Sequence, residues 1–420
     1  MSLEFNLISS DEYCTYITDG THGTHSNQEY GKYLLSAKDI LDGNVHIKDN
    51  SRIISEDDFN KIHKNYKLEN YDVLLTVAGT IGRTAIIKNY ENNYTFQRSV
   101  AIFKTNDKIK SLWLYYYLNS PIGKQIIKSL SKGTTQLILP LKDLRSLEIP
   151  VPKNIVDQKK ILSVLTNIDK KIEINKKINK NLADCILAIY RRWFVDFEPF
   201  KNESFIDSDF GFIPENWKVG SIGDYCKLKS GFAFKSAWWQ DEGIKVIKIK
   251  DINQDNIDLS DCSCVSSDKL EKASEFKVIG GDLLIAMTGA TIGKFSIVPK
   301  NDQPLYVNQR VGKFFLGDKP SSKLPFIWSL LKQKRIFDEI INRGQGSAQP
   351  NVSPTDIETI EIILPPIEII NQFNEECQSM FELMINNSYE ITKLNKLRDT
   401  LLPKLMSGEI DVSQINCDLE

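Results

Sequence analysis

Two glutamine–arginine pairs carry side chains that can read the edges of nucleic-acid bases. Gln97-Arg98 lies in segment 96–100, and Gln309-Arg310 lies in the similar segment 308–311. Glutamine can form two hydrogen bonds with adenine, and arginine can form two with guanine. Residues shared by two binding modules cannot tell two different sequences apart. The shared pairs are therefore predicted to serve structure or phosphate contact, with base reading as the alternative.

Both pairs belong to a repeat whose two copies lie about 210 residues apart. The copies keep the same motifs in the same order, and the offset grows slightly along the chain, as one-residue loop insertions would cause. This order predicts two copies of one module, suited to a target with two parts. The paired segments are 72–79 with 282–289, 80–83 with 291–294, 96–100 with 308–311, 133–136 with 346–349, and 149–158 with 363–372.

Base selection is expected from positions at which the two copies differ. The candidates are Thr21, His22, Thr24 and His25 in the first copy, and Lys229, Ser230, Phe232 and Lys235 in the second. The two histidines could also suggest a metal site, but no acidic or cysteine partner lies at a telling spacing, so no metal is expected. Trp238-Trp239 can stack on bases or pack within the protein.

Two kinds of polar loop are candidates for contact with a nucleic-acid backbone. The Thr-Ile-Gly-basic turns, which end at Arg83 and Lys294, can cradle a phosphate, or they can be tight turns that need glycine at positive φ. Two glycine-containing loops are predicted to face DNA, with plain surface loops as the alternative. Their candidate residues are Lys132, Thr134, Gln136, Arg343, Gln345 and Gln349.

No catalytic constellation is evident. The segment 364–367, Leu-Pro-Pro-Ile, lacks the polar first residue and the aromatic last residue of an adenine methyltransferase motif, and no Walker motif occurs. The chain has 420 residues, a net charge of -2 and seven scattered cysteines, so nucleic-acid binding has to rest on local patches. Scattered cysteines, no signal pattern and no long apolar run predict a cytoplasmic protein outside the membrane.

The elements that must position these residues fall into two classes. Segments 73–77 and 99–103 read as strands, and an apolar stripe predicts a helix over 112–130, broken at Pro121, with a counterpart over 325–341. Two much longer stretches, 156–194 and 370–405, keep a heptad seam that includes Asn175, Asn179 and Asn387. An isolated helix would expose this stripe, so the two helices are expected to pair.

Charge favours pairing of these two helices with each other. Residues 157–194 contain nine basic and four acidic residues, a net +5, whereas 368–406 contain four basic and six acidic residues, a net -2. Opposite charge favours this hetero-pairing over self-pairing. The seam asparagines are predicted to fix register, with a frayed seam edge as the alternative. The predicted segments are 1–153, 154–196, 197–364 with a linker at its start, 365–408, and a loose acidic tail over 409–420.

These features resemble the specificity subunits of type I restriction-modification systems. The resemblance rests on the two Asp-hydrophobic-Leu segments with their Gly-Thr-Ile-Gly turns, the Ile-Pro-x-Pro entry at 149–152, the opening Phe-Ile-Pro-Glu-Asn-Trp at 212–217, and the helix ending over 397–410. It implies an α+β fold of two tandem α/β target recognition domains with pseudo-twofold symmetry, joined by two long helices in an antiparallel coiled coil.

The resemblance also implies a function. Each module would read one half of a split site in double-stranded DNA, and the helices would act as a ruler and dock two methyltransferase subunits, with restriction and translocase subunits joining them. The chain itself would be non-catalytic and bind no cofactor, while its partners use S-adenosylmethionine, ATP and Mg. The alternatives are a recognition subunit of a type IIB-like restriction system and a coiled-coil adaptor that does not bind DNA.

Overall fold

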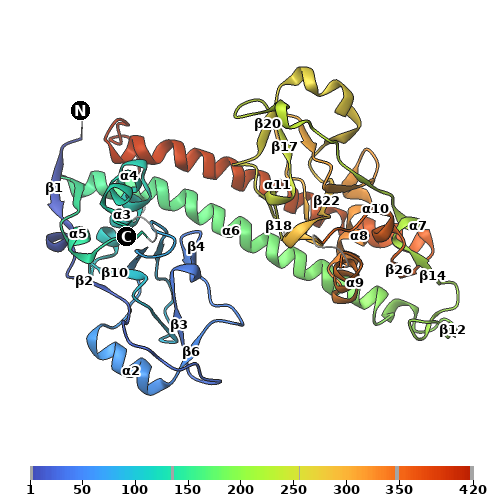
Figure 1. Cartoon of the computed structure of the whole chain (residues 1–420), viewed down its shortest axis with the longest axis horizontal. Helices are drawn as coiled ribbons and strands as arrows, with labels where there is room; N and C mark the ends of the chain where they lie inside the picture. Colours follow the sequence, from blue (N-terminus) through green and yellow to red (C-terminus); the bar gives the residue numbers. More distant parts are fainter. Residues whose placement is uncertain (1–2, 134–136, 255, 346–349, 417–420) are drawn as a thin grey trace. The chain divides into compact units, whose positions relative to one another are not determined.

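The computed structural model describes residues 3–133, 137–254, 256–345 and 350–416 (Figure 1). The chain forms two compact units, residues 1–170 with 395–420 and residues 171–394. The boundary between the units therefore falls inside each of the two long helices and does not coincide with their ends. Among the described residues, no helix combines the length and apolar composition needed to cross a membrane.

The centre of the first unit is an antiparallel sheet with strand order β2-β10-β7-β8. Val73 and Leu75 contribute to one hydrophobic core and Leu74 to another, because successive strand residues point to opposite faces. Burial on both faces explains why β7 reads as a continuous apolar run, and the predicted strands are confirmed. The four strands are β2 (Tyr16–Asp19), β7 (Val73–Thr76), β8 (Thr84–Ile86) and β10 (Val100–Lys104).

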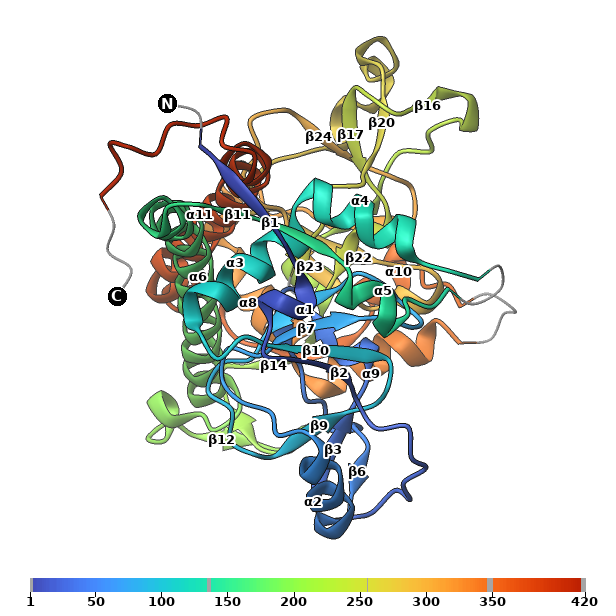
Figure 2. The same cartoon turned by 90° about the vertical axis from the view of Figure 1, so that its left-hand side faces the viewer.

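A second, three-stranded sheet lies beside helix α2 in the first unit, away from α3 and α4 (Figure 2). Helix α2 (Glu56–Asn65) begins where the Ser55 hydroxyl accepts the Asp58 N–H, and it buries Phe59 and Ile62. The sheet consists of β6 (Ile53–Ile54), β3 (Lys32–Leu35) and β9 (Tyr94–Phe96), and β3 and β9 are parallel. The short pairs are β4 (Ile40–Leu41) with β5 (Asn44–Val45), and β1 (Phe5–Ser9) with β11 (Glu148–Pro152).

The helices of the first unit cover the other face of its central sheet. The predicted break at Pro121 is confirmed, since α3 ends at Asn119 and Ser120 caps the next helix, with Pro121 at its first position. Trp113 and Tyr117 of α3 are fully buried. The helices are α1 (Ser10–Tyr13), α3 (Lys108–Asn119), α4 (Pro121–Leu130) and α5 (Leu141–Arg145).

The second unit repeats this topology. Its central sheet has the order β15-β25-β22-β23, which corresponds strand for strand to β2-β10-β7-β8. Its distal sheet keeps the parallel pair, β17 with β24, and gains β16 and β21 at its edges. The strands are β12 (Phe205–Ile206), β13 (Ile213–Pro214), β14 (Lys218–Ser221), β15 (Leu228–Ser230), β16 (Trp239–Gln240), β17 (Ile244–Ile247), β18 (Ile252–Asn253), β19 (Asn256–Ile257), β20 (Ser263–Val265), β21 (Lys277–Val278), β22 (Leu283–Ala286), β23 (Phe295–Ile297), β24 (Leu305–Val307), β25 (Val311–Phe314) and β26 (Glu361–Leu364).

The helices of the second unit differ from the expectation in one respect. The predicted helical stretch over 325–341 is confirmed, but the sequence had placed no break in it, and Lys332 and Gln333 separate two helices. Strand β14 pairs with β26 as β1 pairs with β11. The short helices are α7 (Ile222–Tyr225), α8 (Leu324–Leu331), α9 (Lys334–Arg343) and α10 (Pro354–Glu358).

The two long helices, α6 (Ile155–Phe194) and α11 (Ile367–Met406), contact each other within each unit. In the second unit, Asn387 Nδ2 donates to Asn179 Oδ1 at 2.9 Å, and Asn175 Nδ2 donates to Glu390 at 2.7 Å. Higher numbers on α6 meet lower numbers on α11, so the helices are antiparallel. Asn175 and Asn387 are buried, which places them inside the seam and away from a frayed edge.

In the first unit, the helix pair is joined by charge and by apolar packing. Arg398 Nη1 lies 3.0 Å from Asp169 Oδ1. Ile161 and Leu165 share a core with Leu402 and Leu405. Helix pairing and the predicted seam are thus confirmed in both units.

The segment after α11 is not the loose tail predicted from the sequence. Val412 is buried, and Ile410 and Ile415 pack against the core of the first unit. Lys160 Nζ also donates to the Ser413 carbonyl at 2.5 Å. The expectation is therefore wrong for residues 410–415, because three spaced apolar side chains anchor this segment.

Candidate nucleic-acid interface

In the first unit, two candidate segments meet at the end of the central sheet. The segment after β2 forms a parallel bridge between Thr21 and Gln97. This approach needs glycine at position 20, because a Cβ there would lie 2.2 Å from the Phe96 carbonyl oxygen. The structure thus brings Thr21 and His22 next to Gln97 and Arg98.

The second unit builds the same junction. Phe232 bridges Asn308 in parallel, and a Cβ on Gly231 would lie 2.4 Å from the Val307 carbonyl oxygen. Gly20 and Gly231 are therefore equivalent, and so are Thr21 and Phe232.

Backbone hydrogen bonds show that the two glutamine–arginine pairs are not at equivalent positions. The Arg98 N–H donates to the Thr21 carbonyl at 3.1 Å, whereas in the second unit the Gln309 N–H donates to the Phe232 carbonyl at 2.9 Å. Arg98 thus corresponds to Gln309.

The neighbouring bonds extend the same register. The Gln97 N–H donates to Leu35 O at 2.8 Å, as the Asn308 N–H donates to Ile247 O at 2.9 Å. The Ser99 carbonyl accepts the Val77 N–H at 2.9 Å, as the Arg310 carbonyl accepts the Met287 N–H at 3.1 Å. The sequence-level match of the two pairs is wrong by one residue.

The loop that follows Thr21 is held by its own side chains. His22 Nε2 lies 2.9 Å from Asp19 Oδ2, and Thr21 Oγ1 lies 3.0 Å from His25 Nε2. His25 Nδ1 lies 3.3 Å from Asp58 of α2. Thr24 and His22 are exposed. In the described ranges, no group of three or more His, Cys, Asp or Glu side chains is arranged to hold a metal ion.

The corresponding loop of the second unit is aromatic and basic. The Phe232 ring stacks on Trp238 with centroids 6.3 Å apart, and Lys235 Nζ lies 5.6 Å from the Trp238 centroid. Lys229 Nζ lies 4.9 Å from the Phe315 centroid, within the range of a cation–π contact. Ser230 is half-buried at the end of β15. Trp238 is half-buried and packs against the core beside the distal sheet.

The two Thr-Ile-Gly turns are tight turns between adjacent strands. Gly79 and Gly82 have φ of 77° and 88°, and Gly289 and Gly293 have φ of 72° and 80°. This agreement confirms the turn interpretation. The basic residues that follow, Arg83 and Lys294, are half-buried.

The polar loops hold the remaining candidates in different ways. Lys132 Nζ lies 2.5 Å from Asp143 Oδ2. Arg343 is held inside the second unit, where Nε lies 2.8 Å from Glu339 and Nη1 donates to the Asp356 carbonyl at 2.5 Å. Gln345 is exposed. Three predicted residues lie outside the described residues: Thr134, Gln136 and Gln349.

Each central sheet has a buried ion pair beside it. Asp72 Oδ2 lies 2.8 Å from Lys104 Nζ, and Asp282 Oδ2 lies 2.8 Å from Lys313 Nζ. Burial raises the pKa of Asp72 to about 6, although hydrogen bonding to Lys104 opposes this rise. Burial likewise raises the pKa of Asp282. Neither carboxylate is available to a ligand, so this repeated motif serves the fold.

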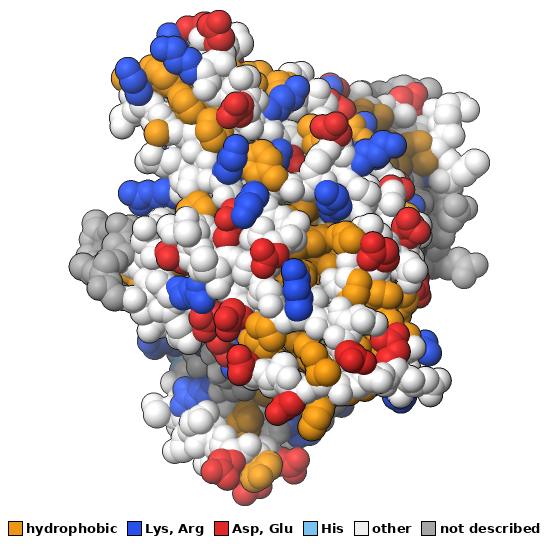
Figure 3. Space-filling model, turned by 90° about the vertical axis from the view of Figure 1, so that its right-hand side faces the viewer, with side chains coloured by type: hydrophobic (Ala, Val, Ile, Leu, Met, Phe, Trp, Pro, Cys, Tyr) orange, Lys and Arg blue, Asp and Glu red, His pale blue; other side chains and the backbone are white. Residues whose placement is uncertain are grey.

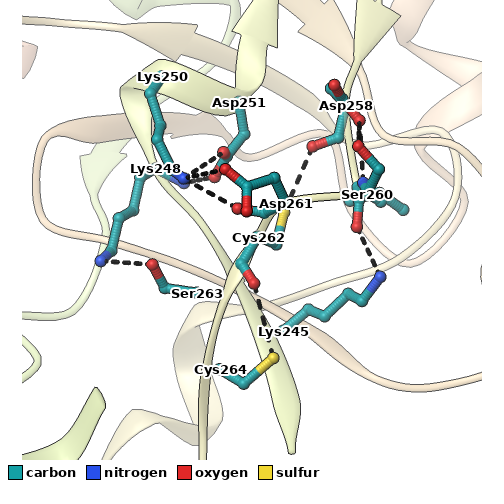
Figure 4. Close-up of polar contacts among 11 residues, drawn as sticks. Lys245, Lys248, Lys250, Asp251, Asp258, Ser260, Asp261, Cys262, Ser263 and Cys264 are labelled. Atoms are coloured by element: carbon teal, nitrogen blue, oxygen red, sulfur yellow. Dashed lines mark hydrogen bonds and ion pairs between the residues drawn. The ribbon is translucent and has the colours of Figure 1, made fainter. Parts of the chain in front are cut away.

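On the face drawn in Figure 3, lysine and arginine side chains alternate with acidic ones. In the distal sheet of the second unit, lysines are tied to local partners (Figure 4). Lys250 Nζ lies 3.0 Å from Asp261 Oδ2, and Lys248 Nζ donates to Ser263 Oγ at 2.8 Å and lies 3.4 Å from the Trp239 centroid.

Sequence reasoning missed Ser99 and Asn308 as members of the junction. Both belong to the three-residue turns 97–99 and 308–310, which we call the β9–β10 turn and the β24–β25 turn. A constant offset of 211 residues from Gly20 and Gly231 to Val100 and Val311 was the signal that could have found them.

The chain is similar to proteins of a known family. A family model described as the type I restriction modification DNA specificity domain matches residues 12–183 and 214–397. The chain is 32% identical over 356 residues to the MjaIX type I restriction enzyme specificity subunit of Methanocaldococcus jannaschii. The aligned region covers 82% of this chain and 78% of that relative. It is 30% identical over 406 residues to the EcoBI specificity subunit of Escherichia coli, with 92% and 81% covered. It resembles the S subunit structure from M. genitalium with a TM-score of 0.54, 17% identity and 96% of each chain covered.

Proposed function

Because the chain belongs to the type I restriction-modification DNA specificity subunits, we propose that each of its two units reads one half of a split target in double-stranded DNA. The observation that carries this proposal is the junction at the end of each central sheet. The two junctions share one backbone framework, yet their exposed side chains differ. Two reading heads for two different half-sites need this combination, since base edges carry the sequence information.

Affinity is expected to come mainly from the assembled complex. The chain has a net charge of -2, so long-range attraction to phosphates is weak, and local basic residues have to supply the contacts. We propose that α6 and α11 set the distance between the half-sites and dock two methyltransferase subunits, with restriction and translocase subunits joining them. The chain itself is non-catalytic in this proposal and acts in the cytoplasm.

Cofactors belong to the partners in this proposal. Methylation at adenine N6 would use S-adenosylmethionine, and translocation would use ATP and Mg, both on other subunits. The chain contributes selection of the DNA sequence and geometry. Binding through two linked heads gains avidity only when the spacing of the half-sites matches the spacing of the heads.

The test is to map N6-methyladenine in a methylation-free host that expresses this chain with its methyltransferase subunit. The expected result is a split motif with a fixed unspecified spacer. Removal of one heptad from both long helices should change the permitted spacer, or abolish methylation, while each half-site keeps its sequence. A soluble complex that adds no methylation would contradict the proposal.

A further inference from the structure

The two three-residue turns at the sheet ends combine a fixed backbone with variable side chains. In the β9–β10 turn, Gln97, Arg98 and Ser99 occupy the positions that Asn308, Gln309 and Arg310 occupy in the β24–β25 turn. Every one of the three positions therefore differs between the units. The glutamine–arginine pair that the sequence repeats is displaced by one residue and is not a shared contact.

Three backbone N–H groups in or next to each turn are hydrogen-bonded within the protein. In the second unit, the N–H groups of Asn308, Gln309 and Val311 donate to backbone carbonyls at 2.9 Å each. The first unit makes the same three bonds at 2.8, 3.1 and 3.1 Å. These three N–H groups are therefore not available to a phosphate, and the bonds fix the backbone that carries the turn side chains.

The side chains at the turn tips are free to contact DNA. Arg98, Gln309 and Arg310 are exposed, and none of their side chains forms a hydrogen bond or ion pair with another residue in the described ranges. Arg343 and Lys250, in contrast, are held by acidic partners. An arginine without a protein partner is free to turn its planar guanidinium group toward a ligand edge and to form two hydrogen bonds with it.

The pattern of differences separates base contact from phosphate contact. Phosphates are the same in every sequence, so a phosphate contact gives no reason for the two units to differ. We propose that the exposed turn side chains, Arg98, Gln309 and Arg310, read bases, and that Arg310 selects a guanine in the half-site read by the second unit. Ser99 holds the same position in the first unit, where its Oγ accepts the Ala37 N–H at 3.1 Å. The inference rests on the proposed function and deepens it.

The test compares methylation motifs of three full-length chains, each expressed with the methyltransferase subunit in a methylation-free host. The chains are wild type, Arg310→Lys and Arg310→Ala. Lysine keeps the positive charge but loses the planar two-bond geometry, whereas alanine loses both. We expect both variants to lose about tenfold to a hundredfold of the preference for one guanine-containing base pair, the range of a good bidentate contact. The half-site read by the first unit should stay unchanged.

Two results would overturn the inference. One is an unaltered motif in both variants. The other is a uniform fall in methylation with Arg310→Ala and full activity with Arg310→Lys, which would mark a phosphate contact. If Arg310→Ala fails to assemble, Arg310→Lys alone decides between a relaxed and an unchanged base pair. Failure of the proposed function can be distinguished from failure of this inference, because wild type would then give no split motif.

A gain-of-contact variant gives an independent check. Ser99→Arg places arginine at the equivalent position of the first unit, and Ser99→Ala controls for the lost bond to Ala37. We expect Ser99→Arg alone to add a guanine preference to the first half-site. A motif identical to that of Ser99→Ala would argue against base reading at this position.

Discussion

The first and second units build the same framework from different details, most clearly in the ion pair under each central sheet. Asp72 and Asp282 are equivalent, but their lysines are not. Strand pairing makes Lys313 the counterpart of Ile102, so Lys104 lies two residues further along its strand. Residues two apart on a strand point to the same face, so either position can reach the buried carboxylate. The fold thus requires a cation beside this aspartate, while its place in the sequence is free to move.

The distal sheets differ more deeply. In the first unit, Phe59 and Ile62 of α2 are buried as part of the distal core. In the second unit, the corresponding segment forms short 3-10 turns, and polar contacts of Lys248 and Lys250 hold the neighbouring strands (Figure 4). Conserved central sheets with divergent distal sheets are what two heads for different half-sites require.

The largest expected effect is the loss of either buried aspartate. Asp282→Ala leaves Lys313 largely buried without its acidic partner, which should destabilise the second unit by about 3–5 kcal/mol. Asp72→Ala should destabilise the first unit by less, because Lys104 keeps Glu69 at 3.0 Å. Hydrogen exchange of the central-sheet amides, measured unit by unit, checks this. Asp261→Ala is the control, because its side chain is 94% exposed and its pairing with Lys250 should matter by less than about 1 kcal/mol. Equal effects of all three changes would break the comparison.

Relocating the lysine sharpens the same comparison. Lys313→Ile should destabilise the second unit by about 3 kcal/mol, because Asp282 loses its cation. Adding Phe315→Lys copies the arrangement of the first unit and should restore more than half of that loss. Urea unfolding of the single and double variants measures the recovery. A double variant no more stable than Lys313→Ile would show that the second unit cannot accept the other position.

A smaller effect is expected where the long helices pair. The second unit uses an amide contact, Asn387 with Asn179, and the first uses an ion pair, Arg398 with Asp169. Asn387→Leu should lower the free energy of unfolding by about 1–3 kcal/mol, because the part-buried amide oxygen of Asn179 loses its hydrogen-bond donor. Arg398→Met should cost about 1 kcal/mol or less, and that cost should shrink in 1 M salt. Unfolding at low and high salt tests the contrast, and equal salt dependence of both variants would contradict it.

A change of stability with pH is also expected. Burial raises the pKa of Asp72 from 3.8 to about 6, so the folded unit holds this proton more tightly than the unfolded chain. The resulting stabilisation is complete below pH 3.8 and is lost as the pH rises through about 6. Relative to Asp72→Asn, wild type should therefore lose stability between pH 4 and 7. Thermal unfolding of both proteins across this range checks the sign. A wild-type stability that rises with pH relative to that of Asp72→Asn would contradict the prediction.

The sequence was sufficient to predict the repeat, the central strands and the paired long helices, because each has a strong apolar pattern. It was insufficient for the turns 97–99 and 308–310. No apolar pattern fixes the alignment of three polar residues, and matching the shared glutamine–arginine pair shifted the alignment by one residue. The tail was missed because Ile410, Val412 and Ile415 stand singly among polar residues, without a helical or strand period that would indicate burial.

The anchoring of residues 402–412 in the first unit also bears on how the protein is made. Leu402, Leu405 and Val412 complete a core that contains Tyr13 and Ile161, and the whole second unit is encoded between these two parts. During translation, part of the apolar core of the first unit therefore stays uncovered until residues 402–412 have been made. A chain cut short anywhere in the second unit therefore lacks part of the first unit's core as well as part of the second unit.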